Sequence, residues 1–270
     1  LAEPETIRIG DVVRATETDF RLVECFDAAT NACTLTPSCR LKHLFDDALA
    51  PAGRMSEQEL LALTELDLKR RFKMLGEVLL GHLRYGTSGN FDSVSCHPYA
   101  RKSIWPTRNL LVAGNFNLTN TSELNSSLTE RGAHVIYSTD TQSILEEIGF
   151  WLDEEHDRLF KAFKDQGLEG AAVQSEISKH MDIGNVLRKA AKNWDGGYAI
   201  AGLIGNGDSF VIRDPNGIRP LVMGKRETPA GTEYMVASES VALDADGFTV
   251  LRDVSPGEAV YITEQGELHS

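Results

Sequence analysis

Several polar, glycine-rich runs contain the residue types that can hold a small zwitterion. Arg84 lies in GHLRYGTSG (81–89), where a guanidinium beside a Gly/Thr/Ser turn can bind a carboxylate through two hydrogen bonds. GNFNLTN (114–120) follows a predicted strand, and a loop rich in Asn and Gly can direct N–H groups at one anion, as an oxyanion hole requires. In STDTQ (138–142), Asp140 stands at the start of a predicted helix and can cap it or bind an ammonium group.

Each of these residues also has an ordinary structural interpretation. Arg84 alone is typical of a surface ion pair, Asn115 and Asn117 of turns, and Asp140 of an N-cap. RDPNGIRPL (213–221) alone predicts a strand, a Pro-Asn-Gly turn and a second strand. The functional interpretation depends on these runs occurring together and in this order.

Three of the four cysteines are clustered near the start of the chain. Cys25, Cys33 and Cys39 lie within fifteen residues, whereas Cys96 stands alone and is expected in a loop or the core. The spacing is not that of a CxxC zinc site. A Thr-Pro pair before Cys39 predicts a helix start, where the helix dipole favours thiolate over thiol. Three thiolates suit an iron–sulfur cluster with an open fourth site, and three cysteines without a role are the alternative.

The elements that position these residues change in character along the chain. An apolar stripe predicts a helix at 41–49, which Pro51 ends, and Ser56–Arg71 is predicted as a second helix with Ser56 as its N-cap. Further helices are predicted at 141–152 and 183–194, and the acidic run EEHDRLF (154–160) is expected to be a solvated face. The predicted strands are 77–80, 109–113, 133–137, 197–204, 209–213, 233–238 and 258–263.

Composition restricts the class of protein. A formal net charge of −13 argues against a general nucleic-acid or anionic-membrane surface, so no DNA binding is expected. No apolar run approaches the roughly 20 residues of a membrane helix, and the first residues do not form a signal peptide. We therefore expect a cytoplasmic protein without a membrane partner. The first residue is Leu1, not Met, which favours a fragment or a processed form.

The polar runs occur in an order that resembles a known family. These runs are GHLRYGTSG, GNFNLTN, STDT, WDGGYAIAGLI, RDPNGIRPL, VASES (236–240) and DVSPGEAVYI (253–262). Over about residues 70–268 they resemble the glutaminase domain of amidophosphoribosyltransferases, which are class II glutamine amidotransferases of purine biosynthesis. The resemblance implies an α+β fold, the N-terminal-nucleophile hydrolase αββα sandwich, with glutamine as substrate and no cofactor.

The resemblance also implies a role for each residue of the site. Arg84 would bind the glutamine α-carboxylate and Asp140 its α-ammonium. Asn115 and the backbone N–H of Phe116 would hold the oxyanion. Tyr85 and Thr87, beside Arg84, complete the implied substrate-binding set.

The sequence departs from the family pattern around the reacting atoms. The family has His before the catalytic Asn and Gly after it, where this chain has Gly114 and Phe116. It also begins with a Cys-Gly strand whose thiol attacks the amide, and no such strand precedes residue 77. We therefore expect a sandwich incomplete at its N-terminus, no nucleophile and no turnover by this chain alone. The phosphoribosyltransferase domain would be a separate partner, and homo-oligomerisation is left open.

The first fifty residues resemble a different family. The run IRIGDVVRATETDFRLVECFDAATNACTLTPSCRLKHLFDDAL resembles the C-terminal part of nitric-oxide-sensing iron–sulfur repressors of the NsrR type. There Cys25, Cys33 and Cys39 would bind the cluster. The expected organisation is a repressor-like fragment with a short helix (1–52), a helical junction (53–76) and the amidotransferase domain (77–270). This arrangement predicts a chimera, and an iron–sulfur sensor fragment is the alternative function.

Overall fold

The computed structural model describes residues 62–64, 67, 76–83, 96–133, 139–229 and 231–270. The chain divides into two compact units, Leu1–Leu79 and Leu80–Ser270, which we describe separately. The predicted helix at 41–49, the strand at 133–137 (except Ala133, which is not in a strand) and the cysteines at 25, 33 and 39 lie outside the described residues.

In the unit Leu1–Leu79, Thr64 caps a helical turn. The Thr64 hydroxyl donates to a carboxylate oxygen of Asp67 at 2.6 Å and accepts from the Asp67 backbone N–H at 3.2 Å. Residues 62–64 are not helical, so the predicted continuous helix Ser56–Arg71 is wrong there. The predicted strand at 77–80 is also wrong. Its Val78 and Leu79 side chains are 44% and 70% exposed, so apolar character alone did not produce a strand.

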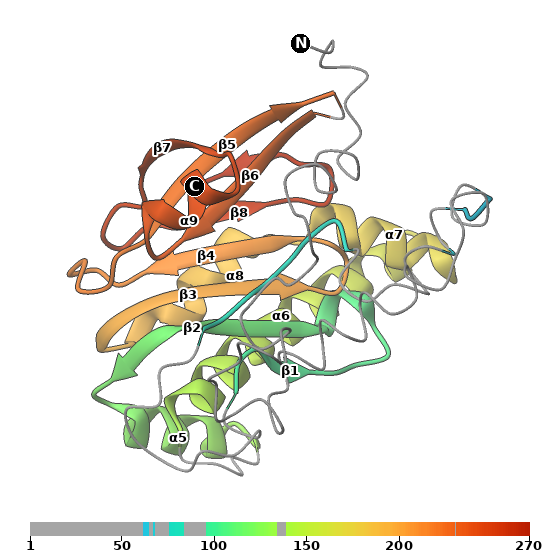
Figure 1. Cartoon of the computed structure of the whole chain (residues 1–270). Helices are drawn as coiled ribbons and strands as arrows, with labels where there is room; N and C mark the ends of the chain where they lie inside the picture. The colour runs from blue at the N-terminus through green and yellow to red at the C-terminus, as the bar shows by residue number, and fades with distance from the viewer. Residues whose placement is uncertain (1–61, 65–66, 68–75, 84–95, 134–138, 230) are drawn as a thin grey trace, which may run out of the picture. The chain divides into compact units, whose positions relative to one another are not determined.

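The unit Leu80–Ser270 contains two antiparallel sheets (Figure 1). The larger has the strand order β1-β2-β3-β4-β8-β9, and the smaller has the order β6-β5-β7. The larger sheet consists of β1 (Tyr99–Arg101), β2 (Leu110–Leu118), β3 (Gly196–Ile204), β4 (Ser209–Arg213), β8 (Ala259–Ile262) and β9 (Leu268–His269). The smaller consists of β5 (Val222–Thr228), β6 (Gly231–Ala237) and β7 (Thr249–Asp253). The predicted strand at 209–213 is confirmed, and the strands at 197–204, 233–238 and 258–263 are confirmed to within a few residues.

The helices lie mainly between β2 and β3 in sequence. They are α5 (Thr121–Glu130), α6 (Asp140–Asp165), α7 (Ala171–His180) and α8 (Ile183–Ala190), with short 3-10 turns η6 (Pro106–Arg108) and η7 (Ala191–Asn193). A further helix, α9 (Ser240–Ala245), follows β6. The sequence predicted α6 and α8, and a helical stretch at 151–182 that contains α7, but not α5. No helix among the described residues has the length and apolarity needed to cross a membrane.

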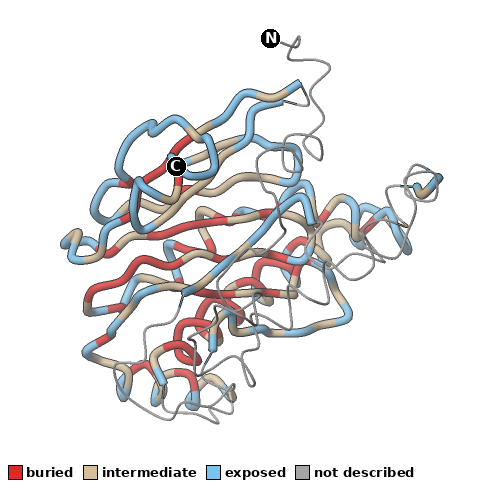
Figure 2. Tube along the Cα trace, viewed as in Figure 1, coloured by how far each residue is buried: buried red, intermediate tan, exposed pale blue. Residues whose placement is uncertain are grey.

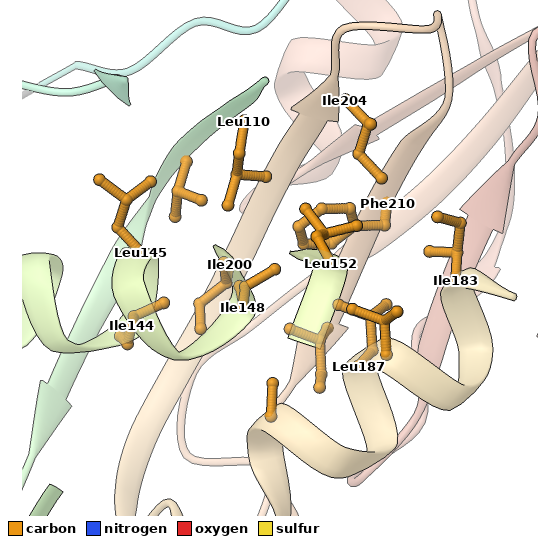
Figure 3. Packing of buried hydrophobic residues seen from close by; sticks show 14 of the residues in the cluster. Leu110, Ile144, Leu145, Ile148, Leu152, Ile183, Leu187, Ile200, Ile204 and Phe210 are labelled. Atoms are coloured by element: carbon orange, nitrogen blue, oxygen red, sulfur yellow. The ribbon is translucent and has the colours of Figure 1, made fainter. Parts of the chain in front are cut away.

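Helices α6 and α8 cover one face of the larger sheet (Figure 3). Ile144, Ile148 and Leu152 recur at helical spacing along α6, and each is fully buried. They point toward Leu110 of β2 and Ile200 of β3. Because every second residue of a strand faces the same side, β2 and β3 direct only alternate side chains into this core.

The smaller sheet packs on the opposite face of the larger one. Ala199, Val211 and Val260 from the larger sheet share a buried cluster with Leu221 and with Met223 of β5. The next residue of β5, Gly224, faces α9, where an added Cβ would lie 3.1 Å from the buried Leu243. The layers therefore follow the order helices, sheet, sheet, helix, and β7 is exposed along its whole length (Figure 2).

Side chains in the C-terminal half of α6 bond to β1, at the edge of the larger sheet, and to the turn η6. Arg101 of β1 donates two hydrogen bonds to the Asp153 carboxylate, at 3.2 and 2.5 Å. The Thr107 hydroxyl and the His156 ring nitrogen Nδ1 lie 2.8 Å apart, and both side chains are buried. Glu155 is also buried and accepts from Arg158. The expectation of a solvated face at 154–160 is therefore wrong for Glu155 and His156, which α6 packs into the structure, whereas Glu154, Asp157 and Arg158 are exposed.

Candidate functional site

Asn115 and Phe116 lie inside strand β2, not in a loop. The predicted strand ends at 113, but β2 continues to Leu118 and pairs Asn115 with Ala199 and Phe116 with Tyr198. Tertiary pairing here outweighs the low strand preference of Asn and Gly. Asn115 and Asn117 are exposed on the sheet face opposite α6, whereas the Phe116 side chain packs on the helix side.

The edge of β2 brings two of the predicted site residues together. Backbone N–H groups alternate in direction along a strand, so those of Gly114, Phe116 and Leu118 point to the same side. The Gly114 N–H donates to His97 Nδ1 at 3.3 Å, and the Leu118 N–H donates to the Asp140 carboxylate. The Phe116 N–H therefore lies between a histidine and a carboxylate on this edge.

Asp140 is the first residue of α6 and not its N-cap. Thr139 caps the helix, accepting from the Gln142 N–H at 3.4 Å, which leaves the Asp140 carboxylate for other contacts. Burial raises the pKa of Asp140 above its ordinary 3.8, although the N–H groups of Thr141, Leu118 and Asp140 itself act in the opposite direction. Among the described residues, no charged side chain contributes to this pKa shift to offset the desolvation of the half-buried carboxylate.

Gly196 lets β3 approach the end of β2, and Gly197 lets the loop between β4 and β5 approach β3. An added Cβ at Gly196, whose φ is +135°, would lie 2.2 Å from the Asn117 carbonyl oxygen. An added Cβ at Gly197 would lie 2.8 Å from the Ile218 side chain. Both glycines of the WDGG run are therefore required by close approach.

The RDPNGIRPL run is held by one buried carboxylate. Oδ1 of Asp214 accepts from the N–H groups of Asn216 (3.0 Å) and Ile218 (2.9 Å). Oδ2 accepts from those of Arg219 (3.0 Å) and Tyr198 (3.3 Å). Burial opposes ionisation of the fully buried Asp214, but these N–H groups outweigh it and lower its pKa below 3.8.

Arg213 holds the same loop through its backbone carbonyl groups. Its guanidinium donates to the carbonyl oxygens of Arg219 at 2.7 Å, Val254 at 2.7 Å and Gly217 at 3.1 Å. The predicted turn is confirmed, but the strand after it begins at Val222 and not within 213–221. Arg213 and Asp214 therefore have structural roles. Together they position the exposed Ile218 next to Gly197.

By its resemblance to the family, His97 was expected to be a structural residue and not a metal ligand, but its hydrogen-bond partners were not predicted. Besides accepting from Gly114, this ring lies 3.2 Å from the Thr141 hydroxyl through Nε2. Its neighbour Cys96 is exposed. The position of His97 just before a strand and a proline gave no clear signal, because its partners come from β2 and α6 and are distant in sequence.

The remaining predicted site residues are not placed. Arg84, Tyr85 and Thr87 lie outside the described residues, as do Cys25, Cys33 and Cys39. Within the part of the chain that the structure describes, no group of His, Cys, Asp or Glu could hold a metal ion. The iron–sulfur site and the sensor function therefore stay predictions, and none of the comparisons below supports the repressor-like N-terminal fragment.

Known proteins share sequence with most of the chain. No protein-family profile matches it. An amidophosphoribosyltransferase of Pseudomonas aeruginosa is 36% identical over 200 residues, covering 73% of this chain and 36% of the relative. That of Escherichia coli K12 is 39% identical over 199 residues, covering 73% and 35%. That of Schizosaccharomyces pombe is 35% identical over 191 residues, covering 70% and 32%.

About 70% of the chain is thus homologous to the glutamine amidotransferase region of these enzymes, and the chain spans about a third of their length. Among solved structures, a glutamine phosphoribosylpyrophosphate amidotransferase from B. subtilis complexed with ADP and GMP matches at a TM-score of 0.48 and 27% identity, covering 70% of this chain and 33% of that chain. The allosteric regulatory enzyme of purine biosynthesis matches at 0.49 and 27%, covering 70% and 34%.

Proposed function

We propose that the unit Leu80–Ser270 is a glutamine-binding amidotransferase domain with the N-terminal-nucleophile hydrolase fold. The order of its layers, helices, sheet, sheet and helix, supports this fold. The observation that carries the proposal is the β2 edge, where the Phe116 N–H lies between the contacts of His97 and Asp140. The homology to amidophosphoribosyltransferases supports glutamine as the ligand.

In this proposal the site recognises both ends of glutamine. Asp140, half-buried and at the start of α6, binds the α-ammonium, because a cation would offset its desolvation. The Phe116 N–H and the exposed Asn115 amide polarise the side-chain carbonyl and would hold an oxyanion formed there. Arg84 binds the α-carboxylate, with Tyr85 and Thr87 beside it.

The proposal is limited to binding glutamine and polarising its amide. Hydrolysis requires a nucleophile, and no described residue is assigned that role. The name amidophosphoribosyltransferase describes whole relatives, of which this chain covers about a third. Release of ammonia and its transfer to a phosphoribosyltransferase partner are therefore not part of the proposal for this chain.

Calorimetric titration of the full chain with glutamine tests the proposal. Asp140→Asn should weaken binding at least tenfold, since a hydrogen bond to a charged group contributes about 1.5–3 kcal/mol and 1.4 kcal/mol is a factor of ten. Asn115→Ala should weaken it to a similar or smaller extent. Asn117→Ala is the matched control, because Asn117 is exposed on the same face two residues away.

A second ligand separates recognition of the ammonium from recognition of the amide. Glutaramate, which is glutamine without its α-ammonium, should bind the wild-type chain more weakly than glutamine. Asp140→Asn should not weaken it further, whereas Asn115→Ala should. Absence of glutamine binding by the wild-type chain, or equal binding by the Asp140→Asn variant, would refute the proposed site.

A further inference from the structure

His97 joins the two elements that carry the proposed glutamine contacts. Gly114, whose N–H donates to His97 Nδ1, immediately precedes Asn115 in β2. Thr141, whose hydroxyl lies 3.2 Å from His97 Nε2, immediately follows Asp140 in α6. One imidazole ring therefore sets the distance between the strand and the start of the helix.

The two hydrogen bonds require one tautomer of the ring. Because Nδ1 accepts from the Gly114 N–H, it carries no proton. In the neutral ring the proton is then on Nε2, which donates to the Thr141 hydroxyl. His97 thus acts as a donor toward α6 and an acceptor toward β2, and each contact fixes the direction of the other.

The side chain of His97 extends the register of β1. The β1–β2 ladder pairs Tyr99 with Val112, and His97 lies two residues before Tyr99 while Gly114 lies two residues after Val112. The ring therefore contacts β2 where the backbone of the next ladder pair would be. A backbone hydrogen bond at this position would join only β1 and β2, whereas the imidazole forms hydrogen bonds with both β2 and α6.

Both departures from the family pattern around Asn115 contact this ring. Gly114 supplies the N–H, and an added Cβ at that position would lie 2.3 Å from the Ala199 carbonyl oxygen, so the backbone lies close to β3. Phe116 stacks on His97, with ring centroids 5.3 Å apart and planes 18° apart. The ring is further held by His82, whose centroid is 4.4 Å away.

We propose that His97 is a positioning residue that holds Asn115 and the Phe116 N–H in register with Asp140. This inference rests on the proposed glutamine site. His97 itself does not contact the glutamine; it acts through Gly114 and Thr141. Phe116 and His97 function as a pair, because the aromatic ring fixes the plane in which the imidazole bonds to both elements.

Two variants separate the hydrogen bonds of His97 from its packing. His97→Phe keeps a ring for stacking on Phe116 but removes both hydrogen bonds. His97→Gln supplies an amide that can accept from Gly114 and donate to Thr141. His180→Phe is the matched control, because His180 is an exposed residue of α7 whose ring contacts Phe163 edge-on, near the other end of α6.

Glutamine titration of the full chain should show about a tenfold loss of affinity in His97→Phe, as expected for two lost hydrogen bonds. His97→Gln should recover to within about threefold of the wild type, and His180→Phe should not change. When Asp140→Asn and Asn115→Ala are combined, their losses of glutamine-binding free energy should be non-additive in the wild-type background and additive in the His97→Phe background. If His97 only stabilised the fold, His97→Phe would lower the unfolding temperature but leave this non-additivity unchanged.

Wild-type affinity in His97→Phe, or unchanged coupling, would overturn the inference while leaving the glutamine site in place. If the wild-type chain binds no glutamine, the proposed function fails, and amide hydrogen exchange then decides on His97 alone. Exchange at 114–118 and at 139–143 should accelerate together in His97→Phe and slow again in His97→Gln. Unchanged exchange at either segment would refute the link between β2 and α6.

Discussion

Asp214→Asn tests whether one carboxylate holds the loop between β4 and β5. The substitution preserves size but replaces one acceptor oxygen by an NH2 group. Whichever way the amide turns, two of the four N–H groups that Asp214 accepts would face another donor. Because a hydrogen bond to a charged group contributes about 1.5–3 kcal/mol, losing two of them should cost about 3–6 kcal/mol.

Urea unfolding followed by tryptophan fluorescence measures this cost. The three tryptophans, Trp105, Trp151 and Trp194, all belong to the unit Leu80–Ser270, so the signal reports that unit. Asp244→Asn is the control, since Asp244 is exposed and the change should stay within about 0.5 kcal/mol. If Asp214→Asn changed the unfolding free energy no more than the control does, the four backbone N–H groups around Asp214 would not be what holds this loop.

The dependence on pH gives the same test a second arm. The pKa of Asp214 is lower in the folded chain than its ordinary 3.8, because its backbone donors outweigh burial. Its contribution is therefore complete above about pH 3.8 and is lost as the pH falls through the folded pKa. The difference in stability between the wild type and Asp214→Asn should shrink below that pH, and a constant difference would contradict the assignment.

Three further outcomes are expected. For Asp140, whose pKa is raised by burial, the free chain should lose stability as the pH rises from 3.8 through the folded pKa, and Asp140→Asn should remove this loss in urea titrations. For His156, whose pKa is lowered by burial, the contribution to folding stability should be fully present above about pH 6.5 and be lost as the pH falls through the folded pKa. His156→Gln should remove this dependence of the unfolding free energy on pH. Gly196→Ala should cost at least about 2 kcal/mol more than Gly231→Ala in thermal unfolding, because their φ angles match (+135° and +132°) but only the first Cβ meets an atom, the Asn117 carbonyl oxygen.

The sequence predicted strands where apolar residues and turn signals coincide. The segment 209–213 has both, since it is a β-branched and aromatic run that ends at a Pro-Asn-Gly turn, and it forms β4 as expected. The segment 77–80 is apolar but exposed, so composition without a pairing partner was not sufficient. The extension of β2 through Asn115 was missed because its stability comes from pairing with β3, eighty residues later.

The candidate site was predictable only in its separate residues. Asn115 and Asp140 were identified from the resemblance to the family, but the contact that joins their elements, between Asp140 of α6 and the Leu118 N–H at the end of β2, depends on tertiary packing. His97 was expected only as a structural residue, and its two hydrogen-bond partners were not predicted because they are 17 and 44 residues away. The buried Glu155 and His156 were misassigned for a related reason: an acidic run predicts solvent exposure unless the packing partners of the helix are known.

The alternation along β2 has a consequence for any library of variants of this chain. Val112 and Leu118 are buried against the helices, whereas Asn115 and Asn117 are exposed on the other face. Selection for cellular abundance should therefore deplete substitutions at the buried positions and tolerate those at the exposed ones. Selection for ligand binding should also deplete substitutions at Asn115. Comparing the abundance profile with the binding profile along this one strand would then distinguish variants that do not accumulate from variants that accumulate but do not bind.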